Sequence, residues 1–326
     1  MTTPSHAYLG LDVAQVKFDA ALLQDGRTHH HQCPNSATGF TALQRWLAGL
    51  ATLPVHACLE ATGSYGAALA LYLHQQGVRV SVVNPARIKA FGRSELLRTK
   101  TDRVDAALIA RFCAAHQPLA WTPPAPEQRD LQALVRRVAA LQAMRQQERN
   151  RLDLEAADSL LRASLTEHLT HLEHQLATLH AQMRAHLQAH PTLRHQAQLL
   201  QTIPAIGEVT ALKLLAEMPL LGQYRSARQA AAYAGLSPRQ RESGSSVHGK
   251  TRLSKVGNAA VRRALYLPAV VALRANPLLR VFAERLLAAG KPKMAVVGAV
   301  MRKLLHQAHG VLKHNRPFDP NYGAIT

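Results

Sequence analysis

Two aspartates three residues apart, Asp102 and Asp105, have a spacing that suggests chemistry. If a helix begins near Asp102, positions i and i+3 lie on one face, so both carboxylates point the same way. Carboxylates held close together repel each other unless a cation lies between them. Mg²⁺ takes hard oxygen ligands of this kind. The alternative is structural, because Asp102 could cap the helix and Asp105 could be a solvated surface charge.

Two further acids stand where short apolar segments end. Asp12 closes the apolar segment 7–12, and Glu60 closes the segment 55–60. Ligands of open α/β sheets bind at the carboxyl ends of the strands, so four acids from separate parts of the chain could converge on one metal cluster. Each acid also has a plain alternative, because Asp12 could be a turn residue and Glu60 could cap the next helix.

The elements that must position these acids follow from the hydrophobic pattern. A hairpin turn is expected at Asp25-Gly26, where it joins the second strand to a third. The other expected strands are 7–12, 17–23, 55–60 and 78–83, and the expected helices are 39–50, 65–76 and 102–116. This order fits a mixed sheet covered by helices. With its acids it resembles the ribonuclease H-like, Holliday-junction-resolvase-like nucleases, in which two Mg²⁺ ions activate an attacking oxygen and stabilise a leaving oxygen.

The proline-rich stretch Thr122–Pro126 marks the first domain boundary, so residues 1–122 are expected to form one domain. Beyond it, leucines recur at spacings of three and four, and residues 127–190 contain no glycine or proline. This pattern predicts a helical hairpin or a coiled coil. The narrow apolar seam and polar flanks favour self-association, and a helix pair packed within one chain is the alternative.

Residues 196–326 are expected to form a third, mostly helical domain. Its helices are expected at 226–234, 258–274, 277–289 and 294–314. The turn Ile203-Pro204-Ala205-Ile206-Gly207 between two apolar helices is similar to a helix-hairpin-helix element, whose backbone N–H groups can bind a phosphate. A purely structural turn is the alternative. The predicted fold class is therefore α/β plus all-α.

The charge of the chain is strongly positive and uneven. The net charge is +19 with a pI near 10.6, and residues 222–316 hold 18 Lys and Arg against 2 Asp and Glu. Such an excess repels itself unless a polyanion binds, which favours nucleic acid over an anionic membrane. The three cysteines form no CxxC pair, which is consistent with a reducing cytoplasm. No apolar stretch is long enough for a membrane span to be expected.

A serine-rich basic segment, residues 237–255, could carry a nucleophile. Ser243, Ser245 and Ser246 lie within it. Its expected nucleic-acid-binding residues are Arg239, Arg241, Lys250, Arg252 and Lys255. A serine hydroxyl is a weak nucleophile and attacks phosphorus only if a base or a metal helps to remove its proton. The acidic cluster with bound Mg²⁺ is the candidate for that help, and a flexible phosphate clamp without chemistry is the alternative.

Several sequence blocks, taken in order, resemble the insertion-sequence 110 family of transposases, DEDD recombinases guided by a bridge RNA. The blocks are Gly10–Val13, Leu59–Gly63, Lys100–Ala106, Ile203–Gly207, Ala234–Arg239, Ser243-Gly244 and Ser254–Asn258. Ala205 departs from the pattern, because the family's turn usually has glycine there.

The resemblance implies a role for each matching residue. Asp12, Glu60, Asp102 and Asp105 would form the Mg²⁺-binding catalytic tetrad. Ser243 would form a phosphoserine link to DNA, with Ser245 and Ser246 as neighbouring candidates.

The resemblance also implies partners. These would be target and donor DNA, a bridge non-coding RNA and further copies of the chain, in a dimer or tetramer whose active site joins the acids of one subunit to the serine of another. The protein would be bacterial, cytoplasmic and nucleoid-associated. Three other functions compete with this one: a metal-dependent junction-resolving nuclease without a covalent intermediate, an actin-like kinase or ATPase, and a non-enzymatic DNA-binding protein.

Overall fold

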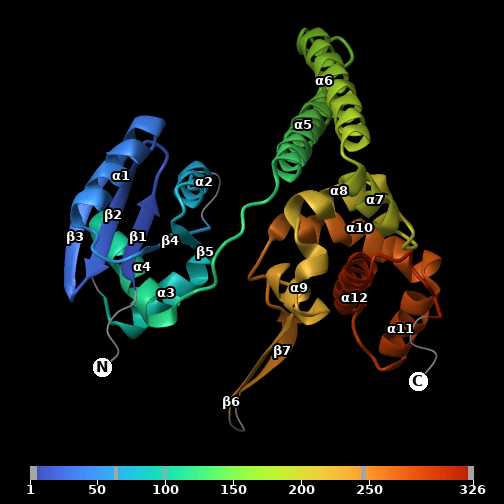
Figure 1. The fold of residues 1–326 in the computed structure, drawn as a ribbon. Coiled ribbons are helices and arrows are strands. Elements are labelled where there is room, and N and C mark those ends of the chain that lie inside the picture. Colours follow the sequence, from blue (N-terminus) through green and yellow to red (C-terminus); the bar gives the residue numbers. More distant parts are fainter. Residues whose placement is uncertain (1–5, 62–64, 98, 100, 244–246, 322–326) are drawn as a thin grey trace. The chain divides into compact units, whose positions relative to one another are not determined.

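The structure is a computed structural model that describes residues 6–61, 65–97, 99, 101–243 and 247–321, with side chains described outside 241–251. The chain divides into two compact units, Met1–Pro123 and Pro124–Thr326 (Figure 1). Each unit has its own hydrophobic core.

The first unit is built on one mixed sheet. Its strands are β1 (Ala7–Val13), β2 (Lys17–Gln24), β3 (Arg27–Pro34), β4 (Val55–Glu60) and β5 (Arg79–Val83). The strand order is β3-β2-β1-β4-β5, with β1 antiparallel to β2 and parallel to β4. The predicted mixed α/β architecture is confirmed, and it fits a ribonuclease H-like domain.

Helices cover both faces of this sheet, and alternate residues of β1 show which face is which. Leu9 and Leu11 pack with α1 (Ala37–Leu50) and α2 (Ala67–Gln75) in one cluster. Tyr8 belongs to a second cluster that includes residues of α3 (Pro85–Ser94) and α4 (Asp102–His116). Because strand side chains alternate between faces, the even-numbered residues of β1 face α4.

Helix α3 is absent from the elements predicted from the sequence. Asn84-Pro85 reads as the end of a strand, but the Asn84 side chain accepts a hydrogen bond from the Ala86 N–H at 2.8 Å and caps the helix. The N–H group at the first helical position has no partner within the helix, so a proline, which lacks that group, fits there. The same two residues therefore end β5 and begin α3.

The second unit begins with a long antiparallel helical hairpin. Helix α5 (Pro126–Leu154) packs against α6 (Leu161–Ala189). A ring nitrogen of His186 lies 2.8 Å from the backbone oxygen of Glu127 near the base, and Arg149 pairs with Glu173 at 2.9 Å. The two helices thus pack within one chain, whereas a coiled coil between chains stays a prediction.

The rest of this unit is a helical bundle that carries one two-stranded hairpin. Its elements are α7 (Pro191–Gln201), α8 (Glu208–Glu217), the 3₁₀ helix η1 (Leu221–Gln223), α9 (Ala227–Tyr233), β6 (Pro238–Ser243), β7 (Val247–Leu253), α10 (Ala259–Ala275), α11 (Pro277–Ala288) and α12 (Lys293–His314). A single hydrophobic core joins the base of the α5–α6 helical hairpin to α8, α10 and α12.

Among the described residues, no single helix is long and apolar enough to cross a membrane. Helices α10 and α11 together reach that length and composition, but they meet at 91°. Helix α10 also buries Val261, Leu265 and Ala272 in the core of its unit.

A buried acid, Glu217, ties three elements of the second unit together. Its carboxylate accepts hydrogen bonds from Arg136 of α5 at 2.9 Å and from Asn258, the N-cap of α10, at 3.0 Å. Burial raises the pKa of Glu217, but these hydrogen bonds and the charges of Arg136 and Arg263 outweigh burial and hold that pKa below its ordinary value. We call Glu217, Arg136 and Asn258 the Glu217 cluster.

Candidate active site

Asp12 and Glu60 lie side by side at the carboxyl ends of two parallel strands. Leu11 of β1 is the register partner of Leu59 of β4, so the next residue on each strand is an acid. Cys58, two residues before Glu60, lies in the core cluster on the α4 side of the sheet. Both acids therefore face α4, and both are half-buried.

Helix α4 runs antiparallel to β1, which brings its first turn towards the same strand ends. Gln117, just past the helix, donates to the Tyr8 hydroxyl at 3.3 Å. Two residues along the strand, Gly10 lies against Ala106 and Ala110. Asp12 lies two residues beyond Gly10 on β1. One helical turn before Ala106 on α4 lies the turn that holds Asp102 and Asp105. The fold therefore directs all four acids to one end of the sheet.

The structure rejects Asp102 as the helix cap. Thr101 is the N-cap of α4, and its Oγ1 accepts a hydrogen bond from the Val104 N–H at 3.3 Å. Asp102 is the first helical residue, and Asp105 follows one turn later. Negative charges in the first turn are favoured by the helix dipole, so these acids also suit the local structure.

A fifth acid and a lysine, Asp19 and Lys17, border this group. Asp19 is the direct cross-strand partner of Asp12 and is 9% exposed. The Lys17 ammonium group lies 2.9 Å from Asp102 Oδ2 and 3.5 Å from Asp19 Oδ2. The hydrogen bond to Asp102 and the charge of Asp19 raise the pKa of Lys17. The sequence indicates only weakly that Lys17 and Asp19 belong to the site: they are charged residues on either side of Phe18 at the start of a strand.

The donor chemistry at this edge fits a hard divalent cation. Every acid here offers carboxylate oxygens, which Mg²⁺ prefers. The Lys17 ammonium group already neutralises carboxylates from two elements of the fold. Among the described residues, no group of three or more His, Cys, Asp or Glu side chains is spaced as a metal-binding cluster. The fold thus brings the acids to one edge of the sheet but does not close them into a ligand set.

Gly10 sets the distance between β1 and α4, which makes it a test of the site's geometry. A Cβ atom at this position would lie 2.1 Å from the Ala106 backbone oxygen and 2.3 Å from the Ala110 nitrogen. Gly10→Ala is therefore expected to push α4 away from Asp12, to destabilise the protein by about 1–3 kcal/mol and to lower activity by about 10²-fold. Thermal unfolding and a strand-cleavage assay measure the two effects.

Gly49→Ala is the matched control, because a Cβ at Gly49 in α1 meets nothing within 4 Å. It is expected to leave activity unchanged and to favour the helix slightly. Wild-type stability and activity in Gly10→Ala would contradict the close packing of β1 on α4.

Ser243 lies at the end of a strand in the second unit, in the segment that the sequence presents as a loop. Residues 238–243 and 247–253 pair as the antiparallel strands β6 and β7, with Ser243 opposite Val247. Gly244, Ser245 and Ser246 lie outside the described residues. Figure 1 shows the hairpin extending away from the helices of its unit. The strands carry few apolar residues, so no hydrophobic alternation reveals them in the sequence.

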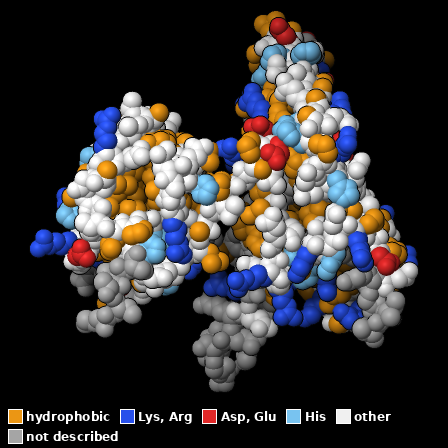
Figure 2. All heavy atoms as spheres, viewed as in Figure 1, with side chains coloured by type: hydrophobic (Ala, Val, Ile, Leu, Met, Phe, Trp, Pro, Cys, Tyr) orange, Lys and Arg blue, Asp and Glu red, His pale blue; other side chains and the backbone are white. Residues whose placement is uncertain are grey.

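Two arginines face each other across the stem of this hairpin. Arg239 and Arg252 are direct register partners, and both are exposed. Like charges directly opposite each other destabilise an antiparallel pair, so this arrangement favours an anion between them. Figure 2 shows lysine and arginine side chains gathered near the base of the hairpin. The side chains of Arg241 and Lys250 lie outside the described part of the chain, and Lys255 is exposed just beyond β7.

The base of the hairpin is held by backbone contacts that join residues 233–237 to residues 254–258. Ser254 N–H donates to the Ser237 oxygen at 2.9 Å, and Asn258 N–H donates to the Tyr233 oxygen at 2.8 Å. A Cβ at Gly257 would lie 2.2 Å from that same Tyr233 oxygen, so only glycine fits there. Asn258 in turn belongs to the Glu217 cluster, which fixes the hairpin stem to α5, α8 and α10.

The turn between α7 and α8 contains an unusual alanine. Ala205 has φ +82°, a left-handed conformation that costs a residue with a Cβ about 1–2 kcal/mol. The backbone thus keeps the conformation that glycine would favour. Gly207 is the N-cap of α8, so the expected phosphate-binding turn has a helix N-terminus behind it.

Known protein families match both units of the chain. A transposase model of the DEDD, IS110 type matches residues 9–157, which contain all four acids. A second model, the Transposase IS116/IS110/IS902 family, matches residues 197–284, which contain Ser243.

Two curated relatives match the chain along nearly its full length, and a third matches a shorter part of it. The pilin gene-inverting proteins of Moraxella bovis and Moraxella lacunata are each 34% identical over 318 residues, covering 97% of this chain and 98% of theirs. The insertion element IS110 uncharacterized 43.6 kDa protein of Streptomyces coelicolor is 35% identical over 128 residues, or 39% of this chain and 30% of that protein. The chain therefore belongs to the IS110 family of DNA transposases and recombinases.

Proposed function

We propose that this protein is an RNA-guided, site-specific DNA recombinase in which Asp12, Glu60, Asp102 and Asp105 hold Mg²⁺ and Ser243 is the nucleophile. The observation that carries the proposal is the register of β1 and β4, which places Asp12 beside Glu60 on the face covered by α4. The packing of Gly10 against α4 adds Asp102 and Asp105 at the same end of the sheet. Mg²⁺ held there supplies positive charge that polarises a phosphate and favours loss of a proton from the attacking hydroxyl.

The serine is supported by its place in the hairpin and by the charge around it. Ser243 ends β6 on a stem whose Arg239 and Arg252 face each other. In the proposed step the Ser243 oxygen bonds to a DNA phosphorus, the adjacent DNA strand leaves as an alcohol, and the link is later reversed by a strand hydroxyl. The basic residues of the stem, with Arg241, Lys250 and Lys255, hold the phosphate and stabilise its charge in the transition state.

The acids and the serine belong to different units of the chain, which supports a composite site. In this proposal, the acids of one subunit meet the serine hairpin of another, and the α5–α6 hairpin mediates self-association. The apolar seam of these helices is buried within the chain, but exposed apolar side chains towards the far end of the hairpin, Met144, Leu154, Leu160 and Leu161, support that role. Ribonuclease H-like, coiled-coil and transposase domains would then correspond to residues 1–122, 127–190 and 196–326.

Guidance by a non-coding RNA is supported by charge and composition. The net charge is +19 and aromatic residues make up only 5% of the chain. Such a protein has strong attraction for nucleic-acid backbones and few stacking platforms for reading bases, which suits recognition by base pairing between a guide RNA and DNA. Because two relatives are named pilin gene-inverting proteins, inversion of a DNA segment is the outcome we favour for its reaction.

A plasmid inversion assay tests this proposal. Purified protein is mixed with RNA transcribed from the DNA flanking its coding sequence, and a plasmid carrying inverted copies of the candidate site. We expect inversion and a covalent protein–DNA adduct in Mg²⁺, and neither with EDTA. Strand breaks without an adduct on a denaturing gel would instead support a metal-dependent nuclease, and inversion without RNA would contradict guidance.

A further inference from the structure

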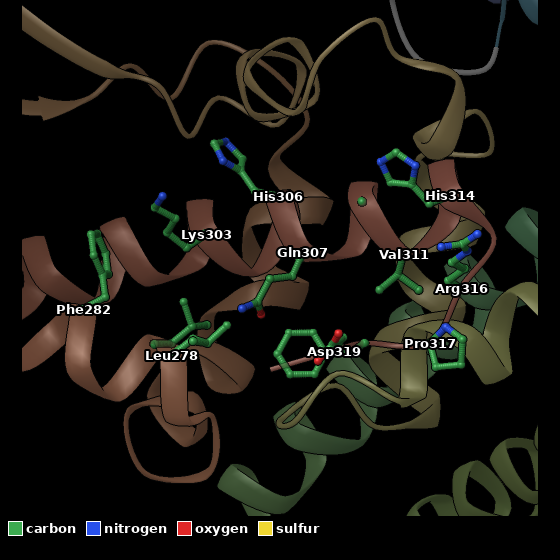
Figure 3. A pocket seen from close by; sticks show the side chains of 13 residues that line it. Leu278, Phe282, Lys303, His306, Gln307, Val311, His314, Arg316, Pro317 and Asp319 are labelled. Atoms are coloured by element: carbon green, nitrogen blue, oxygen red, sulfur yellow. The ribbon is translucent and has the colours of Figure 1, made fainter. Parts of the chain in front are cut away.

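A pocket of about 500 Å³ lies in the second unit, and its lining includes no residue of the serine hairpin. It is formed by α11, α12 and the segment that follows α12 (Figure 3). Its volume is in the range of small-molecule sites in proteins. The functions proposed above leave this pocket without a role.

The pocket offers two aromatic rings beside an aliphatic floor. Leu279 and Val311 are buried in its floor, while Phe282 and Phe318 are half-buried in its walls. The Phe318 backbone N–H donates to Thr202 Oγ1 at 2.8 Å, which fixes that wall to the C-terminus of α7. Flat aromatic ligands, including nucleobases, stack on rings of this kind.

One polar group on the lining, the amide of Gln307, is suited to the edge of a base. The Gln307 Oε1 atom accepts from Asn276 Nδ2 at 3.0 Å, so the Gln307 NH₂ group is left as a donor with no partner among the described residues. His306 Nε2 also has no hydrogen-bond partner in the described part of the chain, but this atom is buried, and Figure 3 shows the His306 ring on the other side of α12 from Gln307, so it does not join this edge. Burial and the nearby charges of Arg302 and Lys303 lower the pKa of His306 to about 4, so its ring is neutral at neutral pH.

Positive charge surrounds this apolar space. Lys303 and Arg316 line the pocket and are exposed, and Asp319 is the single acid among its lining residues. The Lys303 Nζ atom lies 5.5 Å from the centre of the Phe282 ring. Figure 3 shows Lys303 and His306 along one side of α12, with Leu278 and Gln307 along the other. Cations beside apolar and aromatic surfaces fit a ligand that joins an aromatic ring to an anion.

We propose that this pocket binds one nucleoside phosphate, with its base against Phe318, its phosphate held by Arg316, and Lys303 beside Phe282 adding positive charge at the other end of the pocket. The choice of a nucleotide rests on the proposed function, because a protein that acts on nucleic acids meets this chemistry in every strand it binds. An unpaired nucleotide of a bound strand and a free nucleotide present the same groups, and the experiment distinguishes these two sources.

Photocrosslinking of the full-length protein tests the pocket. One arm uses a single strand containing 5-iodouracil, the other uses 5-iodouridine monophosphate, and mass spectrometry identifies the labelled residue. We expect adducts on Phe318. The double variant Lys303→Gln, Arg316→Gln should lower this labelling about tenfold. Arg280→Gln, which removes an exposed charge from α11 outside the pocket lining, should leave it unchanged. Thermal unfolding of each variant verifies folding.

Binding of the 5-iodouracil strand to the protein is measured on the same samples. It separates the pocket proposal from the recombinase proposal. Labelling of the pocket by the strand assigns it to an unpaired nucleotide of bound nucleic acid, and labelling by the monophosphate alone assigns it to a free nucleotide. A strand that is retained but labels only residues outside the pocket, with no labelling by the monophosphate, overturns the pocket proposal and leaves the recombinase proposal standing. If no strand is retained, the recombinase proposal fails, and the monophosphate arm still decides about the pocket.

Discussion

Replacing Ser243 with alanine is expected to abolish the covalent protein–DNA adduct and to lower recombination by roughly 10³-fold or more. The substitution removes the oxygen that would bond to phosphorus and leaves the backbone pairing of Ser243 with Val247 intact. Binding of DNA and RNA should stay within about twofold of wild type, because a small change at the end of an exposed hairpin costs little free energy. Denaturing gels with end-labelled DNA measure the adduct, and mobility shifts measure binding.

Other serines provide the controls for this variant. Ser237→Ala, at the base of the hairpin, should retain the adduct, because Ser237 holds the hairpin through its backbone oxygen. Ser245→Ala and Ser246→Ala test the two neighbouring hydroxyls. An adduct that persists in Ser243→Ala and disappears in one of these variants would transfer the role of nucleophile to that residue.

The second large effect is expected for Glu60→Gln, which should also lower recombination by roughly 10³-fold while DNA binding persists. The change keeps the size of the side chain and removes one of the two negative charges of the Asp12–Glu60 pair. Mg²⁺ bound to the folded wild-type protein should raise its stability by about 2.7 kcal/mol at a concentration 100 times the dissociation constant. We expect the variant to lose this stabilisation, which a thermal shift with and without Mg²⁺ measures.

Glu95→Gln is the matched control for the metal site. Glu95 is an exposed acid of the same unit, 4.0 Å from Arg111, and it lies outside the acid group. It should keep both the activity and the Mg²⁺-dependent stabilisation. Normal recombination by Glu60→Gln would count against a catalytic role for this acid, whereas lost recombination with a normal Mg²⁺ shift would place the metal on other ligands.

The sequence predicts the elements around the acids well, because short apolar runs and apolar residues at helical spacing are recognisable signals. The strand that ends at Glu60 and the helix that begins at Asp102 are examples. The spacing of residues along the sequence does not show which residues face each other on neighbouring strands. Asp19 joins the acids through cross-strand register with Asp12, and Lys17 joins them through a contact with Asp102. Neither relation has a local pattern.

Two other elements show why local patterns fail. Helix α3 begins at a proline, whose usual meaning is the end of an element, although proline is well suited to the first helical turn. The β6–β7 hairpin has polar residues at successive positions, so it lacks the period-two apolar signal and depends on backbone pairing. The Ser243 site is thus predictable by motif similarity and not by periodicity.

The Glu217 cluster gives the long helical hairpin a mechanical property. Helix α5 is held at Arg136 and continues to Leu154, about 27 Å farther along its axis. The helix is therefore a lever, with its fulcrum where Glu217 also holds Asn258 at the foot of the serine hairpin. A rotation of about 5° at that fulcrum moves the far end by roughly 2 Å. A partner that binds the far end of α5 and α6 therefore exerts a torque on the Glu217 cluster, which holds the base of the hairpin that carries Ser243.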